Sequence, residues 1–479
     1  MVFTSLNFLI FFPAVITVYF LLPQKFRWMV LLAASCFFYI NVKPVYAVLL
    51  AGVIATTYIF TNLIDKAKSD KKKKVLLIAD IIITLLPLFF FKYFNFVNDG
   101  IFTLLEYAGI RWPLPDISLL LPVGISFFTF MAIGYAIDVY NEEIEAEKNI
   151  GIVALFLSFF PVVMSGPIER ATNMLEQFKA KLVFNYSMVV SGLQMMLWGY
   201  FMKLVVADRV AIYVNAVFNN AEQHLGSSLF LATLLQPIQI YGDLGGYSLI
   251  AVGCAKVMGI NVMQNFNRPF FASSMSEFWR RWHISLITWL TDYIYTPLSF
   301  NLRKAGMKGI VAALMLTFLI SGIWHGAALT FIVWGLMQGV VLSMEAVTKK
   351  QKTSFEKKHN LNNKWWYVFI GCVITYLIFA FSLVFGGTGA AVSRGFYIIG
   401  KIFTDIAHYP YKDGDTMLYS FIAVSILFIK EFMEEYYPGR ILLFENKKRA
   451  IRWGAYYFVI FLIFYIGVLG GEQFVYFQF

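Results

Sequence analysis

The sequence predicts an all-α polytopic membrane protein, because its composition is strongly apolar and its apolar residues gather in long runs. Hydrophobic residues make up 59% of the 479 residues and charged residues only 14%, whereas soluble proteins average about 45–50% and about 25%. The runs are about 15–24 residues long, enough to cross or enter a hydrocarbon layer about 30 Å thick. We expect about eleven transmembrane helices in a single domain over residues 1–479. Disordered, collagen-like, disulfide-stapled and coiled-coil proteins are excluded.

The net charge of +11 comes from 39 Lys and Arg residues against 28 Asp and Glu residues. Two lysine-rich stretches, residues 66–74 and 349–364, lie between apolar runs and are expected to be loops. Lysines in that position set membrane topology and contact anionic lipid. With both stretches in the cytoplasm, the N-terminus lies outside and the first three spans alternate. We therefore expect membrane lipid as a partner and no nucleic acid.

The apolar runs form simple spans at both ends of the chain. The first run lacks the basic region and the small-residue cleavage site of a signal peptide, so we expect a retained span. Pro161, Gly166 and Pro167 interrupt helix within residues 156–170. Such a break is tolerated in a membrane only against protein or a water-filled cavity, which predicts a re-entrant element. The runs are the N-terminal one before Lys25, one ending at Ile40, Val45–Ile64, Val75–Phe96, Gly309–Ile323, Leu329–Met344, Trp365–Phe385, Met417–Ile429 and Tyr456–Leu469.

Polar motifs interrupt the apolar runs in the middle of the chain, residues 236–300. The motif YGDLGGYS places Asp243 in an expected glycine-rich break, where its carboxylate can cap a helix, orient an imidazole or bind a polar substrate. The motif NFNRPF is an expected loop that offers Asn265, Asn267 and Arg268 as polar donors, or as ordinary solvated loop residues. Ionisable side chains at membrane depth are costly, which makes this region a candidate functional site.

Two of the five histidines lie in apolar sequence, whereas His224, His359 and His408 lie in polar segments. His325 stands in LISGIWHGAALTF, with no formal charge between Lys308 and Glu345. A neutral imidazole is cheaper to bury than an ion and can still accept a proton at neutral pH. The alternative is a packing histidine that is hydrogen-bonded across a helix bundle.

The second histidine in apolar sequence is His283, in SMSEFWRRWHISLITWL. This stretch predicts one amphipathic helix with a serine N-cap and with His283 on its aromatic and apolar face. Glu277 and Arg281 have the i,i+4 spacing of an ion pair. Arg280 and Arg281 are expected to face lipid headgroups or an anionic ligand. The alternative is an interfacial helix anchored by its Trp and Arg residues.

The sequence carries no nucleotide-binding loop, dinucleotide fingerprint, zinc-ligand spacing or serine-nucleophile elbow. Two histidines without a nucleophile favour direct acyl transfer. In that chemistry a histidine deprotonates an acceptor hydroxyl, which then attacks an activated acyl donor.

Several motifs resemble the membrane-bound O-acyltransferases, and within them the branch that O-acetylates bacterial polysaccharides and peptidoglycan. The resemblance follows the order of the chain along most of its length. The motifs are SGPIER (165–170), QNFNRPF (264–270), WRRWHISLITWLTDYIYTPL (279–298), SGIWHGAALTFIVWGL (321–336) and FVYFQF (474–479).

The resemblance implies a ring of transmembrane helices, with re-entrant and interfacial helices, around a central tunnel. It implies His325 as the catalytic base, with His283 as the second histidine. The acyl donor would be a cytoplasmic thioester, acetyl-CoA, with no bound cofactor and no metal. The partners would be a separate extracytoplasmic acetyltransferase and a polysaccharide acceptor, and the location the bacterial inner membrane. The candidate substrate or tunnel residues are Asp243, Asn265, Arg280, Arg281, Trp282 and Trp324.

Two alternative functions are also compatible with the sequence. One is D-alanyl transfer for teichoic acid modification, within the same family. The other is a transporter or flippase whose intramembrane histidines relay protons, although the chain lacks the inverted repeats expected of one. Gly245, Leu249 and Thr291 depart from the family's pattern, and these changes bear on acceptor or partner specificity. Basic residues at 303–308 and 349–364 either attract the phosphates of coenzyme A or an acidic carrier protein, or only set topology.

Overall fold

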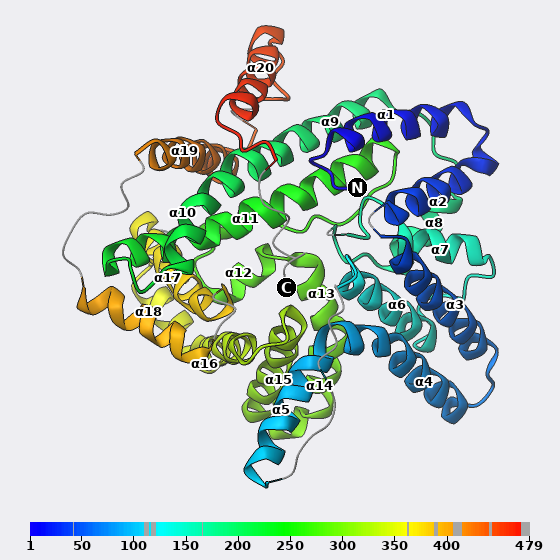
Figure 1. The fold of residues 1–479 in the computed structure, drawn as a ribbon, viewed down its shortest axis with the longest axis horizontal. Coiled ribbons are helices and arrows are strands. Elements are labelled where there is room, and N and C mark those ends of the chain that lie inside the picture. The colour runs from blue at the N-terminus through cyan, green and yellow to red at the C-terminus, as the bar shows by residue number, and fades with distance from the viewer. Residues whose placement is uncertain are drawn as a thin grey trace. The chain divides into compact units, whose positions relative to one another are not determined.

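A computed structural model describes residues 1–41, 43–109, 115, 121–164, 166–361, 364–387, 391–405, 414–439 and 443–470 (Figure 1). Within these ranges the chain is helical with connecting turns and contains no strand, so the predicted all-α class is confirmed. Seven described helices are long and apolar enough to span a membrane. Two shorter ones, Leu6–Leu21 and Ile125–Tyr140, are also apolar. The figure of about eleven spans stays a prediction.

The helices divide into two compact units, residues 1–196 with 250–263 and residues 197–249 with 264–479. The expectation of a single domain stays a prediction. The first unit contains α1 (Leu6–Leu21), α2 (Gln24–Ile40), α3 (Pro44–Lys66), α4 (Asp70–Leu88), the π-helix η1 (Phe89–Tyr93), α5 (Phe94–Tyr107), α6 (Ile125–Tyr140), α7 (Ile150–Ser158), α8 (Ala171–Lys179) and the first part of α9 (Tyr186–Tyr200).

The second unit contains the remaining elements and most of α11. They are η2 (Phe201–Ala207), α10 (Asp208–Asn219), α11 (Gly226–Val257), η3 (Pro269–Phe271), α12 (Met275–Arg281), α13 (Ile284–Leu290), η4 (Thr291–Tyr295), α14 (Thr296–Asn301), η5 (Arg303–Ala305), α15 (Met307–His325), α16 (Leu329–Lys358), α17 (Trp365–Gly387), α18 (Val392–Thr404), α19 (Gly414–Tyr436) and α20 (Arg449–Tyr465).

Most of the expected spans coincide with helices, and the described parts of the two lysine-rich stretches are largely helical rather than loops. Only three residues separate α3 from α4, and Lys71 to Lys74 form the first turns of α4. Likewise α16 continues as helix to Lys358. Lysine is a good helix former, so an apolar helix can extend through a lysine-rich stretch into the aqueous phase.

The expected break after α7 is confirmed. The segment from Phe159 to Arg170 contains no helix in its described residues, and nearly all of them are buried. A Cβ on Gly166 would lie 2.4 Å from the Cα of Val162, so this tight fold of the chain requires glycine. The irregular backbone is thus enclosed by protein, as the membrane requires.

Close packing between helices of the second unit depends on glycines. A Cβ on Gly322 of α15 would lie 2.4 Å from the carbonyl oxygen of Phe331, and one on Gly335 of α16 would lie 2.4 Å from that of Phe318. Close approach through small residues is typical of membrane helices, where lipid offers no hydrophobic drive for packing.

The glycine-rich motif around Asp243 is not a break, contrary to the sequence prediction. Helix α11 runs through it without interruption. A Cβ on Gly242 would lie 2.9 Å from the carbonyl oxygen of Met202, and one on Gly246 2.8 Å from that of Gly199. These glycines therefore allow α11 to pack closely against neighbouring helix backbone.

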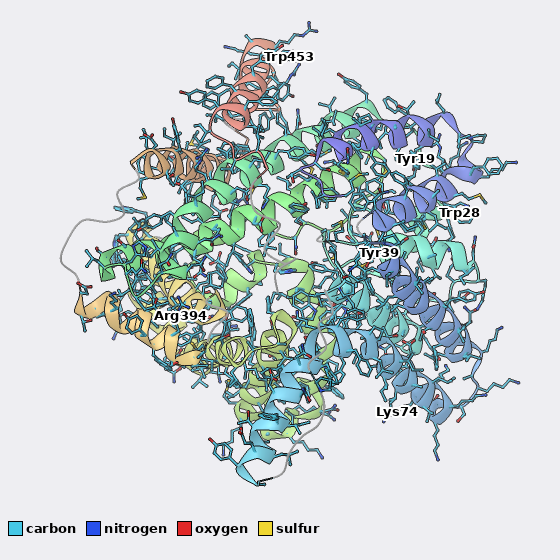
Figure 2. The ribbon with its side chains drawn as sticks, viewed as in Figure 1. Tyr19, Trp28, Tyr39, Lys74, Arg394 and Trp453 are labelled. Atoms are coloured by element: carbon cyan, nitrogen blue, oxygen red, sulfur yellow. The ribbon has the colours of Figure 1, made fainter. Side chains whose placement is uncertain are left out.

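Large apolar side chains cover outward-facing helix surfaces in both units. Leu104 is 72% exposed, Phe421 71% and Phe464 72%, and Trp453 of α20 is 52% exposed (Figure 2). Soluble proteins rarely expose so much apolar surface, so these faces are suited to lipid.

Candidate active site

His283 lies at a break between two short helices, not within one amphipathic helix as predicted. Helix α12 ends at Arg281, and Trp282 then adopts extended backbone (φ −109°, ψ 128°). His283 has a left-handed conformation (φ 46°, ψ 50°), and α13 begins at the next residue. A left-handed non-glycine residue is strained and persists only where its surroundings hold it. The predicted serine cap (Ser274) and the Glu277–Arg281 ion pair, at 2.7 Å, are confirmed.

The loop that contains Asn265 holds this break in place. The backbone N–H of Ile284 donates to the carbonyl oxygen of Asn265 at 2.8 Å. The backbone N–H of Asn267 donates to the carbonyl oxygen of Arg281 at 2.9 Å. The side-chain oxygen of Asn265 accepts from the backbone N–H of Ser285 at 3.2 Å and from its hydroxyl at 2.9 Å. The same oxygen lies 3.1 Å from Nδ1 of His283.

These contacts determine the tautomer of His283. A backbone N–H only donates, so the Asn265 atom that faces Ser285 is the amide oxygen, and an amide oxygen only accepts. Nδ1 of His283 must therefore carry the proton, which leaves the lone pair of the neutral ring on Nε2. His283 is buried, and burial, with a smaller contribution from the nearby His325, lowers its pKa to about 3. The imidazole is thus neutral at physiological pH.

His325 is the last residue of α15 and is only partly buried. Its Nδ1 lies 2.6 Å from the carbonyl oxygen of Ser321, one helical turn earlier. Because a carbonyl oxygen only accepts, Nδ1 carries the proton and Nε2 of the neutral ring carries the lone pair. Both histidines are therefore held in the tautomer that leaves Nε2 able to accept a proton.

Trp324 contacts both imidazoles. Its ring centroid is 6.1 Å from that of His283 and 5.0 Å from that of His325, edge-on to both. The two imidazoles can lie no farther apart than the sum of these distances. Two histidines remote in sequence thus belong to one cluster. The local sequence around each histidine had marked it as a candidate, but did not show that the two lie together.

Four buried polar groups on α12, α15 and α16 have no hydrogen-bond partner within the described part of the chain. The Trp334 ring centroid lies 4.9 Å from that of His325, and the Trp279 ring lies 6.0 Å from that of Trp334. Buried polar groups are nearly always satisfied, so a cluster of exceptions calls for an explanation. The atoms are Nε1 of Trp279, Nε1 of Trp334, Oγ of Ser321 and Oγ1 of Thr330.

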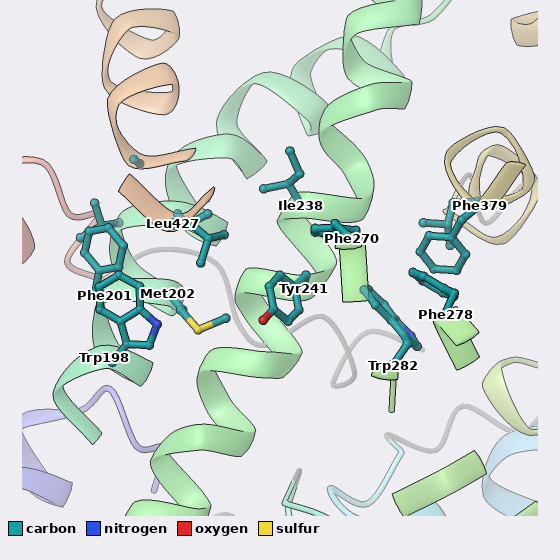
Figure 3. Close-up of a cluster of buried hydrophobic side chains, with 14 of the residues drawn as sticks. Trp198, Phe201, Met202, Ile238, Tyr241, Phe270, Phe278, Trp282, Phe379 and Leu427 are labelled. Atoms are coloured by element: carbon teal, nitrogen blue, oxygen red, sulfur yellow. The ribbon is translucent and has the colours of Figure 1, made fainter. Parts of the chain in front are cut away.

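Trp282 lies in a large aromatic cluster rather than beside a polar group. Its ring packs against Phe278 at 5.3 Å, stacked, and against Phe379 at 4.9 Å. Figure 3 shows Trp282 among Tyr241, Phe270, Phe278 and Phe379. This packing fixes the residue that precedes His283.

Arg280 and Arg281 differ in their surroundings, although the sequence treated them alike. Arg280 is exposed. Arg281 forms ion pairs with Glu277 at 2.7 Å and with Glu435 of α19 at 2.9 Å, and Arg268 pairs with the same Glu435 at 2.9 Å. Arg281 is therefore engaged with two protein carboxylates, whereas Arg280 faces the surroundings.

Glu345 of α16 caps the N-terminus of α12. Its carboxylate accepts from the backbone N–H of Met275 at 2.7 Å, from that of Ser276 at 2.9 Å and from the Ser276 hydroxyl at 2.6 Å. A carboxylate at a helix N-terminus satisfies backbone donors that have no partner within the helix. This contact ties the helix before His283 to the helix after His325.

Asp243 forms a buried ion pair instead of the expected helix cap. Lys203 lies 2.6 Å from Asp243 and 2.7 Å from Asp208, and all three side chains are buried. Sequence reasoning missed Lys203, although a lone lysine in the apolar stretch YFMKLVVA was a usable signal for a buried charge partner. Trp279, Trp334, Ser321 and Glu435 were also missed, because nothing in the local pattern distinguishes them from packing or surface residues.

Comparison with known proteins places this arrangement in a family. Residues 149–384 match the membrane-bound O-acyltransferase family, and this region contains both histidines and Asn265. The chain is 35% identical over 329 residues to the "Probable alginate O-acetylase AlgI" of Pseudomonas aeruginosa, covering 68% of this chain and 62% of that protein. The chain belongs to the membrane-bound O-acyltransferase family.

Other members of the family with different acceptors are also similar to this chain. The peptidoglycan O-acetyltransferase of Helicobacter pylori is 33% identical, over 66% of this chain and 63% of its own length. The teichoic acid D-alanyltransferase of Bacillus subtilis is 26% identical, over 64% of this chain and 76% of its own length. The match thus covers a little under two thirds of the alginate and peptidoglycan relatives named here.

Proposed function

We propose that this protein is a membrane O-acetyltransferase. It passes an acetyl group from acetyl-CoA at the cytoplasmic face of a bacterial inner membrane toward an extracytoplasmic polysaccharide. The observation that carries the proposal is the pair of imidazoles around Trp324, each with its Nδ1 hydrogen-bonded to an oxygen so that the neutral ring has its lone pair on Nε2.

In the proposed reaction His325 acts as general base. Its Nε2 takes the proton of an acceptor hydroxyl while the hydroxyl oxygen attacks the thioester carbonyl. The tetrahedral intermediate then expels the thiolate, and the imidazolium returns the proton to the sulfur. Proton charge balances over the step, so no metal or phosphate needs to take part.

His283 orients the acceptor in this proposal. Because its Nδ1–H donates to Asn265, its Nε2 offers an acceptor and not a donor. It can therefore receive the hydrogen bond of a hydroxyl but cannot stabilise negative charge on a carbonyl oxygen while neutral. The indole N–H of Trp334, which is buried beside His325 and has no hydrogen-bond partner in the described part of the chain, is the donor we assign to that oxygen.

Basic residues at one end of the α15–α16 pair support the choice of donor. Arg303, Lys304 and Lys308 are exposed around the start of α15, and α16, antiparallel to it, ends in exposed lysines. Lys308 lies about 25 Å from His325 along the helix. Acetyl-CoA has a phosphorylated head and a long arm that ends in the thioester. It therefore fits a site in which the basic residues lie far from His325.

Labelled substrate tests the proposal. Membranes that contain the protein and an extracytoplasmic acetyltransferase partner are incubated with acetyl-labelled acetyl-CoA, and label is followed into polysaccharide. We expect transfer that requires His325. Transfer of D-alanine from a thioester carrier instead would favour the alternative that the Bacillus subtilis relative suggests. Movement of an intact solute without consumption of any thioester would overturn the assignment as an acyltransferase.

A further inference from the structure

A second group of buried polar atoms lies in the first unit, among α3, α4 and α6, which pack against one another. Its members are 0–1% exposed, and the structure shows no hydrogen bond or ion pair to five of their side-chain oxygens. They belong to membrane-spanning or apolar helices, where water cannot satisfy them. The atoms are Oγ1 of Thr57, both carboxyl oxygens of Asp80, Oγ1 of Thr84 and Oγ1 of Thr129.

Thr57 and Asp80 lie at the same depth. Helices α3 and α4 are antiparallel neighbours with a three-residue connection between Lys66 and Asp70. Counted from that connection at 1.5 Å per residue, Thr57 and Asp80 are each about 15 Å along their helix. Thr84 follows Asp80 by one turn on the same face.

Helix α6 brings Thr129 to a level between Asp80 and Thr84. Lys73, near the start of α4, pairs with Glu142, just after the end of α6, at 2.5 Å. The amide of Asn62, near the end of α3, donates to the carbonyl oxygen of Glu147 at 3.2 Å. The three helix ends therefore coincide, and Thr129 lies about 17 Å from this common end. All four side chains thus share one stretch of the bundle interior.

A lone carboxyl in this position needs a partner. Burying an ionised carboxylate without a compensating charge costs several kcal/mol even after relaxation. A protonated carboxyl is a donor, and it would be hydrogen-bonded to a hydroxyl or carbonyl oxygen. The described chain provides Asp80 with neither an ion pair nor a hydrogen bond. Oxygens that bind the same cation contact the ion rather than one another. They therefore lie farther apart than hydrogen-bonded oxygens, which agrees with the lack of hydrogen bonds among these side chains in the described chain.

We propose that Asp80, with the hydroxyls of Thr57, Thr84 and Thr129, forms a binding site for a monovalent cation within the membrane. Carboxylate and hydroxyl oxygens are hard ligands suited to such ions. One carboxylate balances a single positive charge, which selects a monovalent over a divalent ion. The site lies outside the histidine cluster and does not depend on the acyl-transfer chemistry.

Binding of radioactive sodium to the purified full-length protein tests the site directly. We expect saturable binding of one ion per chain, absent in Asp80→Asn. Thr57→Val keeps the side-chain shape but removes one ligand oxygen, and it should weaken sodium binding roughly tenfold. Asp70→Asn, the same substitution at the exposed start of the same helix, should bind sodium like the unmodified protein.

Thermal unfolding gives a second readout, which does not depend on activity. Sodium chloride should raise the unfolding temperature above that in choline chloride at equal ionic strength, because an ion that binds only the folded state stabilises it. Asp80→Asn should abolish this difference. An unmodified protein that binds no sodium and responds only to pH would overturn the proposal and leave Asp80 as a protonated acid.

Discussion

The surroundings of the two histidines differ in how completely their polar groups are paired. Around His283, one Asn265 oxygen serves the imidazole and both donors of Ser285, and the loop backbone is bonded to the residues on either side. On the helices that flank His325, the hydroxyls of Ser321 and Thr330 and the indole of Trp334 have no hydrogen-bond partner among the described residues. A paired network holds a geometry, whereas unpaired groups are available to a ligand. The difference supports the proposal that His325 is the general base and that His283, held rigidly, positions the acceptor.

The largest expected effect comes from removing the base. His325→Ala should lower acetyl transfer by about 10²–10⁴-fold, the usual value of general-base catalysis, while the protein still inserts and folds. His283→Asn keeps a residue that tolerates left-handed backbone and should also lose most activity. Transfer assays on both single variants and the double variant measure their coupling.

The double variant should be little worse than His325→Ala alone, because members of one catalytic unit are not additive. Losses that multiply would instead assign His283 an independent, structural role. A His325→Ala protein with undiminished turnover would remove the base assignment.

The unpaired indole gives the next effect. Trp334→Phe keeps an aromatic ring against His325 but deletes the N–H, and we expect about 100-fold lower kcat with little change in KM, as for loss of one donor to a developing oxyanion. Trp366→Phe, at an exposed tryptophan at the start of α17, is the matched control and should leave kcat unchanged. Equal effects of the two substitutions would show that the indole N–H of Trp334 has no special role.

The paired network should respond mainly in stability. Asn265→Ala leaves the donors of Ser285 and His283 without their acceptor, at a cost of about 1–3 kcal/mol in the free energy of unfolding. Asn267→Ala, in the same loop but exposed and bonded through its backbone N–H, should cost far less. Denaturation of both variants in detergent or nanodiscs is the measurement, and similar stabilities would contradict the role given to the Asn265 side chain.

A smaller effect follows from the pKa of His283, about 3 in the folded protein against about 6.5 in an unfolded chain. Between these values the unfolded chain binds a proton that the folded protein does not, so stability rises with pH across the interval. The unfolding temperature should therefore fall on acidification from pH about 7 to about 5. His283→Asn should reduce that fall, whereas His359→Asn, at an exposed histidine, should leave it as steep as in the unmodified protein.

Composition and apolar periodicity predicted what depends on local sequence. The all-α membrane class, the break at residues 159–170 and most spans after residue 300 followed from run length and from proline and glycine positions. His283 and His325 were singled out in the same way, since an imidazole in apolar sequence is conspicuous, and their catalytic roles stay a prediction.

What depends on distant residues could not be predicted in the same way. Apolar periodicity continues across residues 274–290, yet contacts from the Asn265 loop divide this stretch at His283. The motif around Asp243 reads as a turn locally, but its glycines serve packing and its carboxylate binds Lys203. The unpaired indole of Trp334 becomes visible only once α15 and α16 are paired.

The contact between Glu345 and the start of α12 constrains how the protein is made. The two donors it receives from the backbone, at Met275 and Ser276, are about seventy residues earlier in the chain. During synthesis α12 leaves the ribosome well before its capping carboxylate exists, so the geometry around His283 cannot be completed until α16 has entered the bilayer. Assembly of the site is thus a late event of biogenesis, and chains that stop short of α16 lack the carboxylate that caps α12.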